Sequence, residues 1–558
     1  MHLWLTFLVS FTAIASDLQT NIDLAVKDQN VITLSGYGSF RGTTLSASKG
    51  VALNRPIDAW LGIEYSVQPT GQDRFRPPTW PRPFKGVRQA KTSGPACYQD
   101  TKYGSTLQSE ACLLLNIYRP SGVSHDEKLP IFVYIHGGSF VWGSTHSFEG
   151  SSFVAKSQQP LITITMQYRL GVLGSLPSKL MESRGLLNLG LRDQHQMLKF
   201  VQKYAAEFGG DQNRITLGGL SAGAHSVGFH LFHNYGEDST PLFHRAIMAS
   251  GSPSARSFPG VDYELYQQQY RQLMKHLQCP TAPHTTALAC LRATDIDTLQ
   301  FVSSAMYSAS EYNITWPWQP VSPGPMLEQR RSNMSLPRIP IIVTTVRDEG
   351  SRYAPQNLVT QSDFTRFWRN LAPSLTEHEL YTLRQFYTAP NAGMSASRSS
   401  AYISPQFQAM SASYGDYAYI CPARDVARLV ASTHTAVYKA LFDTPNRTPA
   451  YLGVPHASDE QYFIGNTNTE YPSLSDTYSS YFASFVVSGN PNTYALIGSP
   501  EWAIYNGTAR SQLVVSTPDQ GGLRMSREDD SLRSEQCAWW MNDERSTSLH
   551  RFRPYQYT

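Results

Sequence analysis

Short apolar runs recur along the chain and predict buried strands separated by helices. The runs occupy residues 110–120, 129–138, 161–168, 214–217, 244–249, 339–346 and 437–442. Apolar residues at helical spacing instead mark residues 194–208, 222 onward, 362–387 and 474–488. Strands that are apolar on both faces and alternate with helices indicate a mostly parallel, twisted sheet with helices on both faces. The predicted fold class is therefore α/β.

Two parts of the chain, one near the N-terminus and one in the middle, lack this regular alternation of strands and helices. Residues 31–34 begin an alternating apolar pattern, and residues 60–78 are rich in proline and arginine, which we interpret as an approach to the core. From about residue 254 to residue 337, polar helices mix with aromatic stretches, as is typical of large helical insertions. A chain of 558 residues would ordinarily divide into about three or four domains. The candidate site residues below are spread over the whole length, however, and favour one domain from residue 17 to residue 558.

The composition supports a large packed core. Hydrophobic residues make up 41% of the chain, charged residues only 16%, and the formal net charge is +3. The sequence has no basic run of the kind that a phosphate backbone requires. The composition therefore points neither to nucleic acid nor to a strongly acidic substrate.

The N-terminus has the pattern of a signal peptide over residues 1–16. Its apolar stretch, residues 3–14, is too short to span a membrane, and the small residues Ala13 and Ala15 predict cleavage near Ala15 or Ser16. No later stretch is apolar enough to be a transmembrane segment. We therefore expect secretion.

Cysteines and glycosylation sequons agree with a secreted protein. The chain has six cysteines, an even number that allows fifteen disulfide connectivities. Sequons of the form N-x-S/T place candidate N-glycosylation sites at Asn313, Asn333, Asn446 and Asn506.

The strongest chemical signal is a G-x-S-x-G turn between a strand and a helix. Residues 219–223 read Gly-Leu-Ser-Ala-Gly, with an apolar run before them and helical spacing after them. A serine that attacks a carbonyl must stand at the apex of a sharp turn, and Gly219 and Gly223 leave room for the strand and helix to close. A pattern this short also arises by chance, so the interpretation needs a base, an acid and oxyanion donors from elsewhere.

Other turns can supply those parts. His136-Gly137-Gly138-Ser139 follows a strand, where backbone N–H groups of Gly138 and Ser139 can face an oxyanion, although an ordinary strand-to-helix turn would look the same. Asp348 and Glu349 follow the strand at 339–346 and compete for the role of acid. His456 comes last, in the order Ser, acid, His of α/β-hydrolases.

These segments together resemble the type-B carboxylesterases, the family that also holds cholinesterases and fungal lipases. The resemblance is carried by GGLSAGAHS (218–226), SEACLLLNIYRP (109–120), NLGLRDQ (188–194), FGGDQNRITL (208–217), ASGSP (249–253), RDEGS (347–351) and GVPHASDEQYFIG (453–465). It extends from about residue 31 to residue 540, nearly the full chain, and implies the α/β-hydrolase fold.

The resemblance also assigns roles. It implies that Glu349 rather than Asp348 is the acid, that Ser221 is the nucleophile and His456 the base, and that Ser250 supports the site from behind. The amides of Gly138, Ser139 and Ala222 would form the oxyanion hole. The implied disulfides are Cys97–Cys112, Cys279–Cys290 and Cys421–Cys537.

The chain departs from the family pattern at three places, of which two bear on the substrate and the third, Ala111, is interpreted as a structural variation. Leu220 stands where the family has an acidic residue, the first cysteine loop contains no Trp, and Ala111 replaces the usual Asp. Cholinesterases use the acid and the Trp to attract a quaternary ammonium. We therefore do not expect a choline ester.

The sequence as a whole predicts a secreted serine ester hydrolase that works through an acyl-enzyme and needs no metal and no organic cofactor. Its substrate would be a small-molecule or lipid ester. Alternatives are a lipase that acts on long-chain acylglycerols, or a binding protein that uses the same fold without catalysis. Phe140, Trp142, Trp316 and Trp318 could line the pocket or belong to the core.

Overall fold

The structure is a computed structural model, and it describes residues 30–100, 102, 107–236, 240–310, 316–328, 336–388, 404–466, 468–506, 510–516 and 524–553. The predicted signal peptide, with Asn313 and Asn333, lies outside the described residues. No helix among the residues just given combines the length and the apolar character needed to cross a bilayer.

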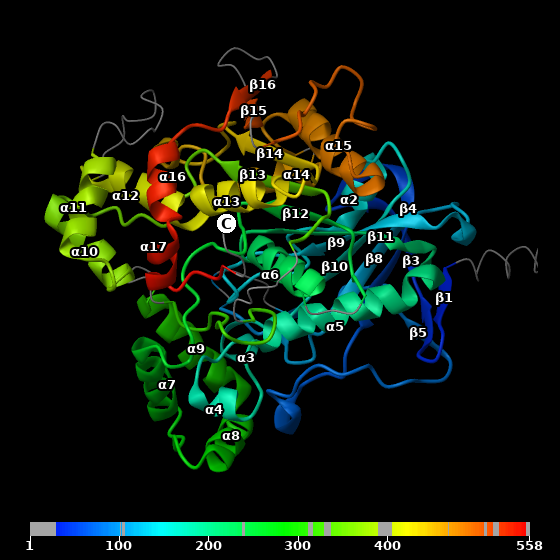
Figure 1. The fold of residues 1–558 in the computed structure, drawn as a ribbon. Helices are drawn as coiled ribbons and strands as arrows, with labels where there is room; N and C mark the ends of the chain where they lie inside the picture. The colour runs from blue at the N-terminus through cyan, green and yellow to red at the C-terminus, as the bar shows by residue number, and fades with distance from the viewer. Residues whose placement is uncertain are drawn as a thin grey trace, which may run out of the picture.

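The described residues form a twisted eleven-stranded sheet (Figure 1). Seven neighbouring strands, from β15 to β10, are parallel, and antiparallel strands extend the sheet at both edges. In spatial order the strands are β16 (Arg524–Asp529), β15 (Ser511–Ser516), β14 (Val437–Phe442), β13 (Ile341–Val346), β12 (Arg245–Ala249), β11 (Gly210–Leu220), β9 (Leu129–Ile135), β10 (Ile162–Met166), β8 (Leu114–Pro120), β4 (Val51–Glu64) and β3 (Thr43–Ser48). The predicted mostly parallel sheet is confirmed.

Helices cover both faces of the sheet. Successive residues of a strand point to opposite faces, so each strand contributes side chains to two separate cores. In β9, Ile131, Val133 and Ile135 belong to the core shared with α5 (Leu189–Tyr204), α6 (Ala222–Gly236) and α13 (Cys421–Ala431). The intervening Phe132 and Tyr134 pack instead with α2 (Gly150–Lys156) and α15 (Pro472–Ser488). This double coverage explains why the central strands are apolar at every position.

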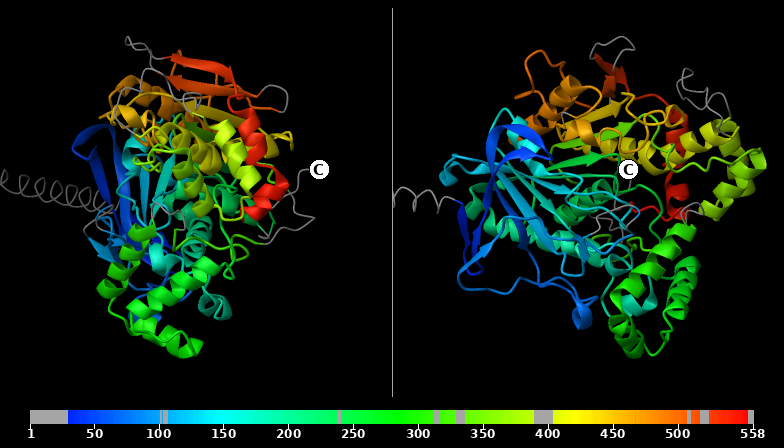
Figure 2. Two further views of the ribbon diagram at one scale, coloured as in Figure 1. Left: turned by 90° about the vertical axis from the view of Figure 1, so that its left-hand side faces the viewer. Right: turned by 180° about the vertical axis from the view of Figure 1, so that it is seen from behind.

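Two helical insertions lie to one side of the sheet (Figure 2). The first contains α7 (Glu264–His276), α8 (His284–Ala293) and α9 (Ile296–Ser310), and the second contains α10 (Gln361–Leu371), α11 (Glu377–Phe386) and α12 (Phe407–Gly415). Each insertion has a hydrophobic core of its own.

The sequence misjudged some boundaries for identifiable reasons. The helix predicted over residues 362–387 is two helices, because Pro373 interrupts it and a capping box built on Thr376 starts the second. The helix predicted at 194–208 begins at Leu189 and ends at Tyr204. Residues 60–64, interpreted as part of an irregular approach, end the long strand β4, in which Trp60 is fully buried.

Three disulfides join the pairs that the resemblance implies: Cys97–Cys112, Cys279–Cys290 and Cys421–Cys537. The first two close short loops, whereas the third spans 116 residues and ties α13 to α16 (Ser534–Trp540). In the chain-entropy model, the longer loop constrains the unfolded chain more strongly.

We therefore expect Cys421→Ser/Cys537→Ser to lower the free energy of unfolding by about 5 kcal/mol, and the control Cys279→Ser/Cys290→Ser to lower it by about 3 kcal/mol. Urea denaturation of both variants beside wild type measures the two losses. A larger loss from the short loop would contradict the loop-length argument.

Candidate active site

Ser221 stands at the apex of the turn between β11 and α6, with a backbone φ of +56°. The turn is tight because glycines flank it. A Cβ on Gly219 would lie 2.6 Å from the carbonyl carbon of Gly223, and a Cβ on Gly223 would lie 2.1 Å from the carbonyl oxygen of Ile135. No side chain fits at either position, so close contact with neighbouring backbone requires both glycines of the G-x-S-x-G pattern.

A hydrogen-bonded chain joins Ser221, His456 and Glu349. The Nε2 atom of His456 lies 2.8 Å from Ser221 Oγ, and its Nδ1 atom lies 2.5 Å from Glu349 Oε2. Ser221 is 8% exposed, His456 4% and Glu349 0%. With neutral imidazole, Nδ1–H donates to the carboxylate and Nε2 accepts from the serine hydroxyl, which is the geometry of a nucleophile, a base and an orienting acid.

The structure separates the two acids that the sequence left in competition. Glu349 faces His456, and its other oxygen accepts the backbone N–H of Val346 at 2.9 Å. Asp348 turns away and accepts the backbone N–H of Val454 at 2.8 Å, while its own N–H donates to the carbonyl of Val454. Asp348 thus holds the loop that carries His456, and Glu349 meets the imidazole itself.

The turn at residues 136–140 lies directly beside the nucleophile. A Cβ on Gly137 would lie 3.1 Å from Ser221 Cβ, and one on Gly138 would lie 1.9 Å from the carbonyl oxygen of Trp142. Gly138 and Ser139 both have positive φ, which aims successive amides inward. His136, which precedes the turn, stacks on Tyr168, and burial lowers its pKa to about 4.

Three amides converge without partners. Among the described residues, the backbone N–H groups of Gly138, Ser139 and Ala222 donate to no protein acceptor. Ala222 is the first residue of α6, where the helix dipole adds positive potential. The arrangement can therefore bind a negatively charged oxygen next to Ser221.

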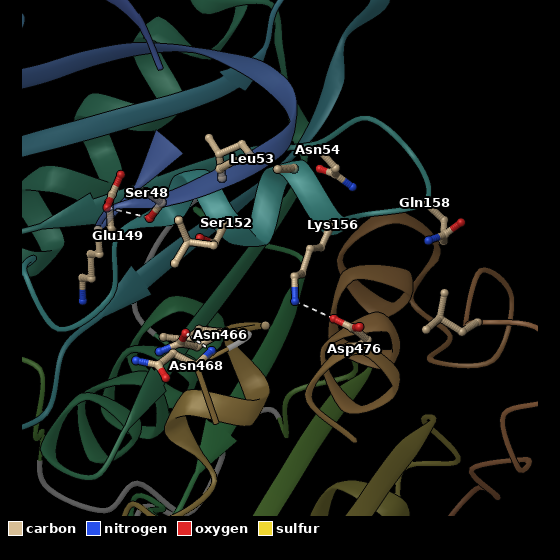
Figure 3. A pocket seen from close by; sticks show the side chains of 17 residues that line it. Ser48, Leu53, Asn54, Glu149, Ser152, Lys156, Gln158, Asn466, Asn468 and Asp476 are labelled. Carbon is tan, nitrogen blue, oxygen red and sulfur yellow. Dashed lines mark hydrogen bonds and ion pairs between the residues drawn. The ribbon is translucent and has the colours of Figure 1, made fainter. Parts of the chain in front are cut away.

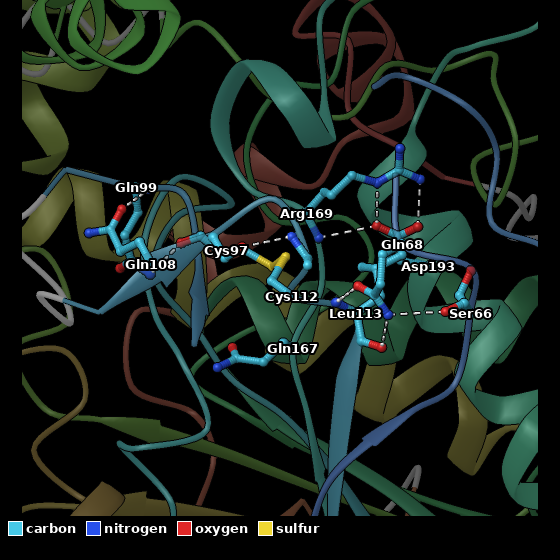
Figure 4. Close-up of a disulfide and its surroundings, with 12 residues drawn as sticks. Ser66, Gln68, Cys97, Gln99, Gln108, Cys112, Leu113, Gln167, Arg169 and Asp193 are labelled. Atoms are coloured by element: carbon cyan, nitrogen blue, oxygen red, sulfur yellow. Dashed lines mark hydrogen bonds and ion pairs between the residues drawn. A yellow bond between two sulfur atoms is a disulfide. The ribbon is translucent and has the colours of Figure 1, made fainter. Parts of the chain in front are cut away.

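The disulfide Cys97–Cys112 lies close to Gln99, whose side chain contacts the segment just after this turn (Figure 4). Two residues after Cys97, the side chain of Gln99 forms a two-point contact with Gly143: its Oε1 accepts the Gly143 N–H at 2.8 Å, and its Nε2 donates to the Gly143 carbonyl at 2.9 Å. Nearby, the buried ion pair of Arg169 and Asp193 fixes the start of the next connection, with an Nη2 to Oδ1 distance of 2.6 Å. Residues that are distant in the sequence thus hold the segment that follows the turn at residues 136–140.

Aromatic rings enclose the imidazole. The rings of Tyr419 and Tyr353 lie 4.3 and 5.5 Å from that of His456, centroid to centroid, and the two tyrosine hydroxyls are hydrogen-bonded at 2.9 Å. Tyr419 comes from a π-helical segment, Asp416–Ile420, between α12 and α13. Burial raises the pKa of both tyrosines, so they present neutral hydroxyls.

A further carboxyl group that sequence reasoning missed lies behind the acid. Asp459 is fully buried, three residues after His456, and accepts a hydrogen bond from Thr344 at 3.3 Å. Burial, and secondarily the charge of Glu349, raise the pKa of Asp459 to about 7. At slightly acidic pH, Asp459 is therefore mostly protonated and neutral. Its place in the loop after His456 was the one available signal.

The remaining predicted residues are less closely tied to the chemistry. Ser250 follows β12, donates its N–H to Thr344 at 2.9 Å, and has a buried hydroxyl with no partner among the described residues. Of the two described sequons, Asn506 is exposed, whereas Asn446 is half-buried and donates from Nδ2 to the carbonyl of Ser458. Phe140, Trp316 and Trp318 are buried.

A cavity of about 470 Å³ opens elsewhere, between the β3–β4 hairpin, α2 and the segment leading to α15 (Figure 3). Its lining includes the ion pair of Lys156 and Asp476 and contains none of Ser221, Glu349 and His456. It is therefore not the reaction site. Within the part of the chain that the structure describes, no cluster of His, Cys, Asp and Glu side chains could hold a metal ion.

A parallel sheet covered on both faces, with a serine on a tight strand-to-helix turn, defines an α/β-hydrolase. The sequence matches the family model described as "Carboxylesterase family" over residues 28–540, and the chain belongs to that family. The resemblance seen in the sequence is thereby confirmed, and the protein is a carboxylic ester hydrolase.

Relatives of this chain include lipases and esterases. It is 41% identical to "Secreted lipase 4" of Gibberella zeae over 532 residues, which cover 94% of this chain and 95% of the relative. It is 27% identical to "Lipase 1" of Geotrichum candidum, over 83% of this chain and 89% of that one. The crystal structure of EstA from Aspergillus niger superposes with a TM-score of 0.78 at 28% identity and covers 93% of this chain and 99% of EstA.

The raised pKa of Asp459 predicts a pH-dependent effect on stability. Because its pKa rises on folding, its favourable contribution is complete below pH 4 and is lost as pH rises through about 7. We expect the variant Asp459→Asn to gain about 2–3 kcal/mol in free energy of unfolding, relative to wild type, between pH 5 and pH 8.

Urea denaturation at the two pH values measures this change. Asp126→Asn, at an exposed position, serves as the control and should show no such difference. A free-energy difference between Asp459→Asn and wild type that is the same at both pH values would contradict the prediction.

Proposed function

We propose that the protein hydrolyses carboxylic esters through a covalent acyl-enzyme on Ser221. His456 takes the proton of Ser221 as its Oγ attacks the ester carbonyl, and then gives that proton to the leaving alcohol. Glu349 fixes the imidazole tautomer and stabilises its charged form. Water, activated by the same His456, then releases the acid. The observation that carries this proposal is the continuous hydrogen-bonded chain from Ser221 through His456 to Glu349.

The three unpartnered amides would stabilise the tetrahedral intermediate. The N–H groups of Gly138, Ser139 and Ala222 are the donors, each worth roughly 3–4 kcal/mol where such donors have been removed. Ser250 and Asp459 support the site from behind, through Thr344 and Glu349. The reaction as proposed uses no metal and no organic cofactor.

We also propose how the chain is processed and where the protein is located. We infer that residues 1–16 are a signal peptide cleaved near Ala15 or Ser16, that residues 17–558 form one domain, and that the mature protein is secreted. The three disulfides and the name of the relative from Gibberella zeae support secretion. The exposed Asn506 is the described sequon best placed for glycosylation.

A second candidate function is hydrolysis of long-chain acylglycerols. It is favoured by the names of two relatives, both lipases. An esterase that acts on short acyl groups and a lipase share this chemistry and differ in the acyl chain that the cleft accepts.

We expect Ser221→Ala to fold normally and to lose about four orders of magnitude or more in kcat on 4-nitrophenyl butyrate. A fluorophosphonate should label wild type once, at Ser221, and should not label the variant. Peptide mass spectrometry locates the label. Wild-type turnover in pure Ser221→Ala, or labelling at another serine, would refute the proposed nucleophile.

The acyl preference is measured with 4-nitrophenyl esters from acetate to palmitate. Because the site is deeply buried, we expect kcat/KM to peak at short chains and to fall at least about tenfold by palmitate. A peak at long chains, together with activity on emulsified triacylglycerol, would instead establish the lipase function.

A further inference from the structure

One buried arginine has neither a counter-ion nor a close hydrogen bond among the described residues. Arg256 lies between β12 and α7, is 7% exposed, and has a backbone φ of +54°. In the described part of the chain no carboxylate lies within ion-pair distance of it, and its Nε has no hydrogen-bond partner. Its polar contact is a long one, 3.5 Å from Nη2 to Oε1 of Gln319.

Each of the other buried arginines makes at least one polar contact of 3.0 Å or less. Four of them form ion pairs: Arg74 with Glu110, Arg169 with Asp193, Arg424 with Asp530 and Arg553 with Asp425. Arg119 and Arg551 donate to backbone carbonyls. Because a guanidinium cannot lose its proton, an unpaired one costs several kcal/mol when buried. The stacking of Arg256 on Trp316, 4.4 Å from the ring centroid, offsets only part of that cost.

Arg256 borders the reaction site. Gln319, which touches its guanidinium, donates from Nε2 to the carbonyl of Ser139 in the oxyanion turn, at 3.0 Å. Trp316 packs against Tyr353, which faces His456.

The charges of Arg256 and His456 both act on a third residue, His225, so Arg256 and His456 lie in the same part of the structure. Burial lowers the pKa of His225, one turn after Ser221, and the charges of Arg256 and His456 lower it further.

There is open space beside the guanidinium. A cavity of about 50 Å³ has a lining that includes Arg256, Gln319, Trp316 and Tyr417, and it lies beside the reaction site rather than within it, since Ser221, Glu349 and His456 do not line it. A volume of this size admits a group as small as a carboxylate. The fork of N–H donors on an arginine matches the two oxygens of such a group.

We propose that Arg256 binds a free carboxylate carried by the ester substrate, so that the enzyme prefers esters such as the half-esters of dicarboxylic acids over their neutral counterparts. The inference rests on the proposed function, and it assigns a substrate class to the same site. The small net charge of the chain is compatible with this proposal, because a single guanidinium can bind a single carboxylate and needs no basic surface around it.

The test compares two pairs of esters. On the acyl side, mono(4-nitrophenyl) adipate is compared with its methyl ester, and on the alcohol side 4-carboxyphenyl butyrate with 4-carbamoylphenyl butyrate. We expect wild type to prefer the anionic member of at least one pair by about tenfold or more in kcat/KM. The pair that shows the preference identifies the part of the substrate that carries the carboxylate.

The variant Arg256→Met should reduce that preference by about tenfold or more, and Arg256→Lys should retain part of it. Arg551→Met is the matched control: Arg551 is equally buried and lies over Tyr417, so its loss should leave the preference unchanged. Should Arg256→Met fail to fold, Gln319→Glu supplies an internal carboxylate beside Arg256 and should also abolish the preference.

An equal rate for both members of both pairs in wild type would overturn the proposal. So would a parallel loss on the anionic and neutral esters in Arg256→Met, since that result would give Arg256 only a positioning role through Gln319. Fluorophosphonate labelling of Ser221 tests the proposed function separately. Calorimetric binding of monomethyl adipate to Ser221→Ala, lost in Ser221→Ala/Arg256→Met, tests carboxylate recognition without turnover.

Discussion

The contact between His456 and Glu349 is the interaction on which the rest of the site depends. It joins a loop after β14 to the end of β13, and it places the imidazole over the serine between β11 and α6. The loop itself has little regular structure, so Asp348 fixes it through hydrogen bonds in both directions with Val454. The sheet thus brings Ser221, Glu349 and His456 near one another, and the buried carboxylate of Glu349 aligns His456 with Ser221.

The turn at residues 136–140 depends on distant segments in the same way. Gln99, two residues after the disulfide-bonded Cys97, forms hydrogen bonds with Gly143, and Gln319 donates to the carbonyl of Ser139. Backbone donors that must wait unpaired for a substrate cannot be fixed by their own hydrogen bonds. Rigid neighbours therefore hold the turn, which lets its amides stay free and correctly aimed.

Much of the fold could be predicted from the sequence, because fully apolar strands and the glycines around Ser221 are visible as short sequence patterns. Glu349 and Asp348 could not be separated from local pattern, since both follow the same strand and only the fold decides which one meets His456. Arg256 and Tyr419 gave no recognisable signal, and Asp459 gave only its place in the loop after His456. Their importance comes from what surrounds them, and burial without a partner is a property of three-dimensional packing.

The π-helical segment Asp416–Ile420 has a consequence for how such a site can change. A π turn holds one residue more than an α turn, and each residue of a helix rotates the following side chains by about 100°. The additional residue of the π turn sets the direction in which two side chains point, Tyr419 toward His456 and Cys421 toward Cys537. Deleting one residue here would rotate Tyr419 away from His456 and Cys421 away from Cys537 at the same time. The number of residues in this helix is therefore as constrained as their identity.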